Sequence, residues 1–197
     1  MKILVATKNP AKLREVREFL KGDFEFVSLA DLPGAPDVEE TGSTFEENSL
    51  LKAKKYFEWS GIPAVADDGG LEIDALGGEP GVKSRRWPGY EAADEELITM
   101  ALEKLRGVPR AKRTARLRTV GTYCDEKRTL AASGSIEGYI VEEAPKRWDE
   151  GYPFRSIFWI PKLRKMYQDL TPAEHDAVNH RRFAYGELAR KILAQGG

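Results

Sequence analysis

The sequence predicts an α/β protein with a mixed β-sheet. In the first half of the chain, short apolar runs alternate with segments whose apolar residues repeat at helical spacing. In the second half, two long runs rich in β-branched and aromatic residues follow each other directly. Strands separated by helices pair in parallel, whereas consecutive strands form antiparallel ladders, so we expect a sheet that contains both kinds of pairing.

The first half of the chain supplies alternating strands and helices. The helix before the second strand has apolar side chains at Leu13, Val16 and Leu20, and the next helix opens with a capping box from Thr44 to Glu47. The third strand delivers the chain into an acidic pair, so this pair is predicted at a strand end. The predicted strands are 2–6, 24–29 and 62–66, and the predicted helices are 13–20 and 44–59.

The second half supplies the antiparallel part of the sheet and the C-terminal helices. An apolar run resumes at 71–76 after two glycines, and Asn179, His180 and Arg181 lie between the last two predicted helices. The predicted strands are 114–124, 129–141 and 157–160, and the predicted helices are 94–105, 172–178 and 182–193.

Composition limits the classes of function. The 197 residues, 41% of them hydrophobic, are enough for one domain or for two lobes around a cleft. The net charge of −1 gives no general attraction to a nucleic acid polymer or an anionic membrane. The single cysteine, Cys124, cannot form an internal disulfide and is expected to fill the core. Without a signal peptide or an 18-residue apolar window, the chain is predicted to be soluble and cytoplasmic.

The first candidate for chemistry is the polar turn between the first strand and the first helix. It contains Thr7, Lys8, Asn9 and Lys12. Free backbone amides and the helix dipole at such a turn favour an anion, and Lys12 adds a positive charge. Asn9 and the following proline equally fit an ordinary capped turn, and the glycine pattern of a Walker loop is absent from the sequence.

The second candidate is a set of carboxylates. Glu39 and Glu40 precede a helix, and Asp67 and Asp68 follow an apolar run and precede two glycines. Carboxylate oxygens suit Mg²⁺, which is commonly held by one or two carboxylates together with substrate phosphates. Adjacent acids more often cap helices or face solvent, but the apolar strand before Asp67 favours the metal site.

The third candidate is a group of cations and aromatic residues. Lys52, Arg86, His180 and Arg181 could neutralise a triphosphate or hydrogen-bond a base, although most Lys and Arg side chains are solvated. Phe154 could stack on a nucleobase, although aromatic residues in such segments more often pack in a core.

Taken together, these segments resemble the inosine triphosphate pyrophosphatase family over nearly the whole chain. The motifs that carry the resemblance are VATKNPAKLREV, EETGSTFEENSLLKA, PAVADDGGLEIDALGGEPGVKSRRWPG and the late NHR. The resemblance implies a single domain over residues 1–197, with a long mixed sheet and flanking helices that form two lobes around a central cleft. It also implies a homodimer and the hydrolysis of nonstandard purine triphosphates such as ITP, dITP and XTP.

The resemblance also implies roles for particular residues. Glu40 and Asp68 match the metal-binding carboxylates, Asp68 matches the general base, and Asp67 lies beside it as a supporting carboxylate. The predicted catalytic residues are Asp68, Asp67 and Lys12, and the metal is Mg²⁺. The predicted substrate-binding residues are Thr7, Lys8, Asn9, Lys12, Lys52, Gly69, Arg86, Phe154, Arg155, His175, His180 and Arg181.

Three positions depart from the family pattern. Arg155 stands where relatives carry an aspartate, and His175 stands where they carry a lysine near the base. Gly69 replaces a serine after the acidic pair, which removes a hydroxyl and leaves the backbone amide. We therefore keep two alternatives open: the same reaction on another standard or modified nucleotide, and a nucleotide-binding module without turnover.

Overall fold

The computed structural model describes residues 1–143 and 146–194 and confirms the predicted α/β class with a mixed sheet. The sheet has seven strands in the order β2-β1-β3-β4-β5-β6-β7. The chain forms two compact units. Unit 1 contains residues 1–69, 119–134 and the chain from His180 on, and unit 2 contains residues 70–118 and 135–179. The implied arrangement of two lobes around a cleft stays a prediction.

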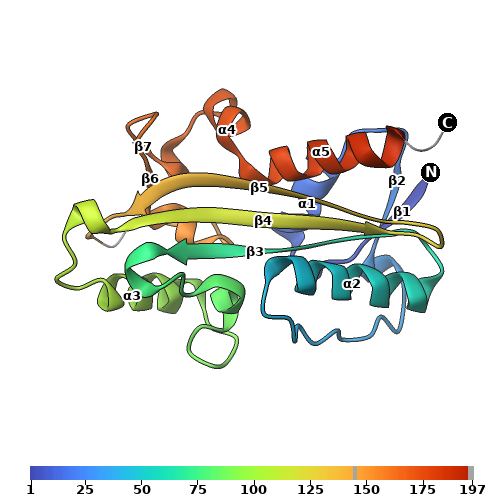
Figure 1. The fold of residues 1–197 in the computed structure, drawn as a ribbon, viewed down its shortest axis with the longest axis horizontal. Helices are drawn as coiled ribbons and strands as arrows, with labels where there is room; N and C mark the ends of the chain where they lie inside the picture. The colour runs from blue at the N-terminus through green and yellow to red at the C-terminus, as the bar shows by residue number, and fades with distance from the viewer. Residues whose placement is uncertain (144–145, 195–197) are drawn as a thin grey trace. The chain divides into compact units, whose positions relative to one another are not determined.

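Unit 1 contains the parallel part of the sheet. β1 (Lys2–Val5) pairs in parallel with β2 (Glu25–Ser28) on one side and with β3 (Ala64–Ile73) on the other. The helices are α1 (Pro10–Phe19), α2 (Phe45–Ser60) and α5 (His180–Ala194). Within this unit, α1 and α5 lie on one face of the strands and α2 lies on the other (Figure 1).

Alternation along the strands of unit 1 explains this layering. Ile3, Val5 and Val65 pack with residues of α1 and α5, whereas Leu4 and Ala64 pack with residues of α2. Successive side chains of a strand point to opposite faces, and each face here is apolar. The apolar runs therefore contain no polar alternation, as is typical of a parallel sheet covered on both sides.

The third predicted strand is longer than the sequence indicated. The expected strand over 62–66 and the expected apolar run over 71–76 are one strand as far as Ile73, followed by a 3₁₀ turn at Asp74–Leu76. The prediction that Asp67 and Asp68 sit at a strand end is therefore wrong. The glycines suggested a turn, but a Cβ at Gly70 would lie 2.0 Å from Ser84 Oγ, so Gly70 makes room for a neighbour rather than for a reversal.

Unit 2 contains the antiparallel part of the sheet. β6 (Phe158–Ile160) pairs antiparallel with β5 (Thr129–Ile140) and with β7 (Lys165–Met166), with Trp159 opposite Tyr139 and Met166. Its core includes Leu71, Leu97, Leu117 and Phe158. The other regular elements that contribute to it are β4 (Thr114–Cys124), α3 (Asp94–Lys104) and α4 (Pro172–Val178). β7 was not predicted, because two residues carry no periodicity.

Two helices of unit 1 begin earlier than predicted. α1 begins at Pro10 rather than at residue 13, because Asn9 caps it and proline is favoured in the first turn. α5 begins at His180 rather than at residue 182. Its first carbonyl lies against β5, where a Cβ at Gly134 would be 2.1 Å from the carbonyl oxygen of His180. Gly134 thus permits a close approach that places His180 and Arg181 in the first turn of α5.

Two expectations about the chain as a whole can be compared with the structure. Cys124 is a buried free cysteine among apolar side chains, which confirms its predicted place in the core. None of the helices formed by residues 1–143 and 146–194 has the length and hydropathy needed to cross a bilayer.

Candidate functional site

The two adjacent aspartates of β3 lie on opposite faces of the strand. Asp67 Oδ2 is 3.1 Å from Lys12 Nζ of α1 and 2.5 Å from Arg181 Nη1 of α5. Asp68 Oδ2 accepts a hydrogen bond of 3.1 Å from Asn48 Nδ2 of α2. This division follows from the alternation of side chains along an extended strand. The acidic pair therefore belongs to two different groups of side chains.

We name the first group, Lys12, Glu15, Asp67 and Arg181, the Asp67 set. Arg181 joins two carboxylates, because its Nε is 3.2 Å from Glu15 Oε2 while its Nη1 meets Asp67. Glu15, Asp67 and Arg181 are all buried. Burial by itself would raise the pKa of Asp67, but the charges of Lys12 and Arg181 outweigh burial and lower this pKa. The ionised form of Asp67 is thus favoured, and it anchors the two cations.

Lys12 is the member of the Asp67 set that projects from the first turn of α1. Burial lowers the pKa of Lys12 more than the nearby Asp67 raises it, and the charge of Arg181 lowers it further. An added anion would favour the charged form of this amine. Lys12 therefore suits the role of a group that meets phosphate oxygens.

We name the second group, Glu40, Asn48, Lys52 and Asp68, the Asp68 set. Lys52 Nζ forms an ion pair with Glu40 and lies 3.9 Å from Asp68 Oδ1. The same Oδ1 accepts a hydrogen bond of 2.9 Å from the backbone amide of Gly69. Lys52 thus connects two carboxylates that are 28 positions apart in sequence.

Asp68 differs from Asp67 in its affinity for protons. Burial raises the pKa of Asp68, the charge of Glu40 raises it further, and the opposing effects of Lys52 and Lys12 are too small to reverse the shift. A carboxylate with a raised pKa is a better proton acceptor than an ordinary one. The two neighbouring aspartates therefore suit different tasks, an ion-pair anchor and a base.

The donor atoms of the Asp68 set fit Mg²⁺. Glu40 and Asp68 both have a carboxylate oxygen near the ammonium group of Lys52, so the two carboxylates can face one positive charge. Within the part of the chain that the structure describes, no three His, Cys, Asp or Glu side chains are grouped so that they could hold a metal. Mg²⁺ does not require such a cage, because water and substrate phosphates complete its shell.

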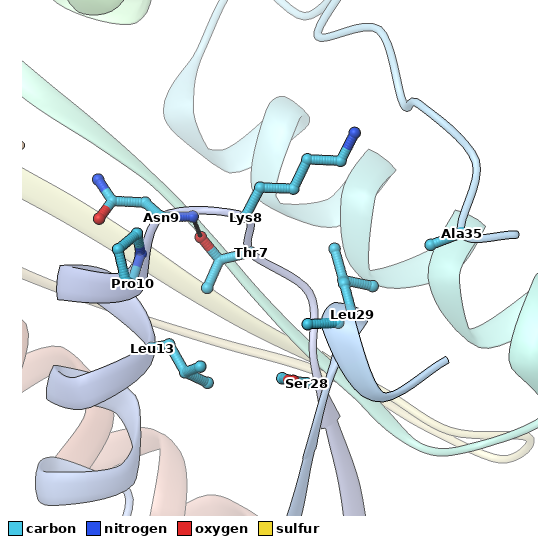
Figure 2. A pocket seen from close by; sticks show the side chains of 9 residues that line it. Thr7, Lys8, Asn9, Pro10, Leu13, Ser28, Leu29 and Ala35 are labelled. Atoms are coloured by element: carbon cyan, nitrogen blue, oxygen red, sulfur yellow. Dashed lines mark hydrogen bonds between the residues drawn. The ribbon is translucent and has the colours of Figure 1, made fainter. Parts of the chain in front are cut away.

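The turn after β1 is organised by Asn9. Its Oδ1 accepts hydrogen bonds from the amides of Ala11 and Lys12, at 2.8 and 3.3 Å. The Asn9 amide donates to Thr7 Oγ1 at 3.2 Å (Figure 2). Two amides that could have met an anion are therefore engaged in capping. Lys8 pairs with Asp37, and both side chains are exposed. An anion at this turn would therefore meet side chains rather than the amides of Ala11 and Lys12.

A cavity of about 340 Å³ lies beside this turn, at the carboxyl ends of the paired strands β1 and β2. Figure 2 shows Thr7, Leu13, Leu29 and Ala35 around it, with Lys8 and Asn9 extending in opposite directions from the turn. The full lining is Thr7, Lys8, Asn9, Pro10, Leu13, Ser28, Leu29, Ala30 and Ala35. Ligands of α/β proteins commonly bind at this end of parallel strands.

Unit 2 holds four of the predicted substrate residues. Phe154 is buried and meets Trp87 edge-on at 6.3 Å between ring centroids. Arg155 is buried, and its guanidinium carbon lies 3.6 Å from the ring centroid of Tyr152 and 5.1 Å from that of Tyr167. Arg86 is exposed at the end of the 3₁₀ turn Gly81–Arg86.

His175 contacts the same tyrosine as Arg155. Its Nε2 lies 3.5 Å from the Tyr167 hydroxyl and 3.2 Å from Asn179 Nδ2, and its ring is edge-on to that of Tyr167. Arg155 and His175, two of the three positions that the resemblance marked as departures, are therefore joined through Tyr167. This connection was not predictable from the sequence, because the three residues lie on three separate elements.

Two members of these groups, Glu15 and Asn48, were missed by the sequence analysis. A usable signal was present in each case. Glu15 follows Lys12 by three positions and Asn48 precedes Lys52 by four, and both spacings put side chains on one face of a helix. A polar residue on the buried face of a helix, next to a predicted site lysine, is thus a candidate for the same site.

Known proteins are similar to this chain over nearly its whole length. The Ham1 family model matches residues 3–191. The dITP/XTP pyrophosphatases of Geobacillus kaustophilus and Exiguobacterium sp. are both 41% identical to the chain, and the matches cover 94% and 99% of this chain and 91% and 96% of those proteins. The Staphylococcus aureus Ham1 structure covers 99% of this chain and all of its own, at 32% identity and a TM-score of 0.86. A Coxiella burnetii HAM1 structure, 35% identical, also has a TM-score of 0.86, with 98% and 99% of the two chains covered. The chain therefore belongs to the Ham1 family.

Proposed function

We propose that this protein is a Mg²⁺-dependent pyrophosphatase that hydrolyses nonstandard purine nucleoside triphosphates to the monophosphate and pyrophosphate. The observation that carries the proposal is the Asp68 set, in which the buried carboxylate of Asp68 lies next to Lys52, Glu40 and Asn48. The names of the relatives, dITP/XTP pyrophosphatases, supply the substrate class.

In the proposed reaction, Asp68 accepts a proton from a water molecule that attacks the α-phosphorus. The bond between the α-phosphorus and the bridging oxygen breaks, and pyrophosphate leaves with that oxygen. Lys12 and Lys52 offset the charge that develops on the phosphate oxygens, and Asp67 keeps Lys12 and Arg181 in place. Thr7 and Asn9 contact the phosphates with their side chains. Positioning and charge neutralisation supply most of the acceleration.

Glu40 and Asp68 are the residues that would hold Mg²⁺, which neutralises phosphate charge when bound. Lys52, which pairs with Glu40, would then be available to the substrate. The other proposed substrate residues are Lys8, Gly69, Arg86, Phe154, Arg155, His175, His180 and Arg181.

The reaction is tested by measuring pyrophosphate release from ITP, dITP and XTP, and from ATP, GTP, CTP and UTP, with Mg²⁺ or with a chelator. We expect release that requires Mg²⁺ and is fastest with the nonstandard purines. Asp68→Asn should lower kcat by roughly 10²- to 10⁴-fold, which is the usual contribution of a general base. Glu58→Gln, at an exposed ion pair, is the control and should keep full activity. Near-normal turnover by Asp68→Asn would contradict the assignment.

A second candidate is the same reaction on another base. It is favoured by Arg155 and His175, which together give Tyr167 two neighbours that differ from the family pattern. Equal rates on ITP, XTP and the standard nucleotides would support this candidate over the first. Tight nucleotide binding without pyrophosphate release would instead indicate a binding module.

The proposal includes a homodimer, which the resemblance to the family supports, and a cytoplasmic location, which the single cysteine suits. Light scattering during size-exclusion chromatography should give twice the 22.1 kDa mass of one chain. A mass of one chain at micromolar concentration would contradict the dimer.

A further inference from the structure

Asn48 is among the most buried polar residues of unit 1, with 1% of its surface exposed, and it uses both ends of its amide. Its Nδ2 donates to Asp68 Oδ2 at 3.1 Å, and its Oδ1 accepts from the backbone amide of Gly42 at 2.8 Å. Gly42 lies two positions after Glu40. One side chain thus connects the strand that carries Asp68 to the segment that carries Glu40.

The orientation of this amide is fixed by its two partners. The backbone of Gly42 can only donate a hydrogen bond at its nitrogen, so the oxygen of Asn48 must face it. The NH₂ group therefore faces Asp68, whose carboxylate accepts. A hydrogen bond to an ionised carboxylate is stronger than one between neutral groups, and burial strengthens it further. Asp68 Oδ2 is held in this way while Oδ1 is held by the amide of Gly69.

The segment around Gly42 also fits tightly against α2. A Cβ at Gly42 would lie 2.7 Å from Asn48 Oδ1 and 2.7 Å from Glu47 Cβ, so only glycine allows this approach. Ser43, the next residue, donates from its backbone amide to Glu47 at 2.6 Å. Close packing and two hydrogen bonds to successive residues of α2 thus locate the end of the Glu40 segment.

We propose that Asn48 is a positioning residue that sets the location of both Asp68 and the Glu40 segment for the reaction. This inference rests on the proposed function. Loss of the side chain would free one oxygen of Asp68 and release Gly42. Groups that orient the ligands of a metal site typically change activity by roughly 10- to 100-fold when removed.

Ser49 provides a matched control for a purely structural role. It follows Asn48 on α2, is completely buried, and shares a hydrogen bond of 2.8 Å with the hydroxyl of Thr122. The described hydrogen bonds of its hydroxyl go to the Glu46 carbonyl oxygen and to Thr122, and not to Asp68 or Gly42. Ser49→Ala therefore removes a buried hydrogen bond from the same helix without releasing either of the two segments that Asn48 holds.

The experiment compares Asn48→Ala, Asn48→Asp and Ser49→Ala in the whole protein by steady-state kinetics and by amide hydrogen exchange of Gly42 without metal or nucleotide. In Asn48→Ala, we expect kcat and kcat/KM to fall equally, by roughly 10- to 100-fold, and Gly42 to exchange faster. In Asn48→Asp, the acceptor for Gly42 remains and the donor to Asp68 is lost, so protection should persist while kcat falls. Ser49→Ala should keep both kcat and protection.

Equal kcat in the three variants and the unmodified protein would overturn this inference without affecting the proposed function. Unchanged hydrogen exchange of the Gly42 amide in Asn48→Ala would also overturn it. A fall in kcat for Ser49→Ala as large as that for Asn48→Ala would show a structural role only, and would also overturn it. Absence of pyrophosphate release from the unmodified protein would overturn the proposed function, a result distinguishable from the others.

Discussion

Arg181 in unit 1 and Arg155 in unit 2 are buried to nearly the same extent, with 5% and 6% of their surfaces exposed, but their described partners differ. Arg181 meets the carboxylates of Glu15 and Asp67, whereas Arg155 lies over the rings of Tyr152 and Tyr167. A carboxylate compensates a buried cation with a full opposite charge, and a ring compensates it with a quadrupole. The comparison predicts a larger loss of stability when Arg181 loses a carboxylate than when Arg155 loses one of these rings.

The largest effect is expected where a buried charge loses its partner. Asp67→Asn leaves Lys12 and Arg181 without the anchor that they share, so the free energy of unfolding should fall by about 3–5 kcal/mol. Urea denaturation of the metal-free protein measures this loss. Glu58→Gln, at an exposed pair, should change it by less than about 0.5 kcal/mol. A similarly small loss for Asp67→Asn would contradict the predicted importance of its ion pairs with Lys12 and Arg181.

A smaller effect is expected where the backbone, rather than the charge, places Arg181. Gly134→Ala puts a Cβ 2.1 Å from the carbonyl oxygen of His180 and should push the first turn of α5 away, with a loss of about 1–3 kcal/mol. Gly186, in the same helix, has no atom within 4 Å of its would-be Cβ. Gly186→Ala should instead stabilise the protein by about 0.5–1 kcal/mol. Both changes can be measured by urea denaturation, and two changes of the same sign would contradict the predicted clash.

In unit 2, the stacked cation should contribute less than the ion pairs of unit 1. A double-mutant cycle of Arg155→Met and Tyr167→Leu should give a coupling of about 0.5–2 kcal/mol in the free energy of unfolding. The matched cycle uses Arg110, which is exposed over Tyr139, and its coupling should be at most about 1 kcal/mol. A coupling larger than the loss caused by Asp67→Asn would contradict the predicted difference between the two arginine sites.

The smallest effect concerns a half-buried carboxylate of unit 2. Hydrogen bonds from Lys165 and then from Thr171 lower the pKa of Glu174 from 4.5 to about 2. Because the folded state lowers this pKa, the stabilisation is present above pH 4.5 and is lost as the pH falls toward 2. The difference in Tm between the unmodified protein and Glu174→Gln should therefore be larger at about pH 6 than at about pH 3. A difference independent of pH would contradict the shift.

The sequence predicted the fold class and most elements because apolar periodicity reports directly on burial. It failed at β3, where Gly69 and Gly70 resembled a turn and the close approach of Ser84 was invisible. In the site, residue types with evident chemistry were found, such as Asp68 and Lys52, and the structure brings these two near each other.

Residues whose role depends on their neighbours were missed or misjudged. Asn48 has no distinctive chemistry until its partners Asp68 and Gly42 are known. Arg155 and His175 were predicted as two departures from one pattern, but their connection through Tyr167 is visible only in the structure. Such contacts link separate elements, and neither spacing nor composition encodes them.

Because Asp67 and Asp68 point to opposite faces of β3, an insertion before them has a different effect when it adds an odd number of residues than when it adds an even number. A one-residue insertion just before Ala66 would move Asp67 into the place of Asp68 and Ala66 into the place of Asp67. Lys12 and Arg181 would then face a methyl group. A two-residue insertion would keep each position of the strand on its original face. Insertions of an odd number of residues are therefore expected to disrupt both groups of side chains, whereas insertions of an even number keep the alternation. This constraint comes from the strand and not from any single side chain.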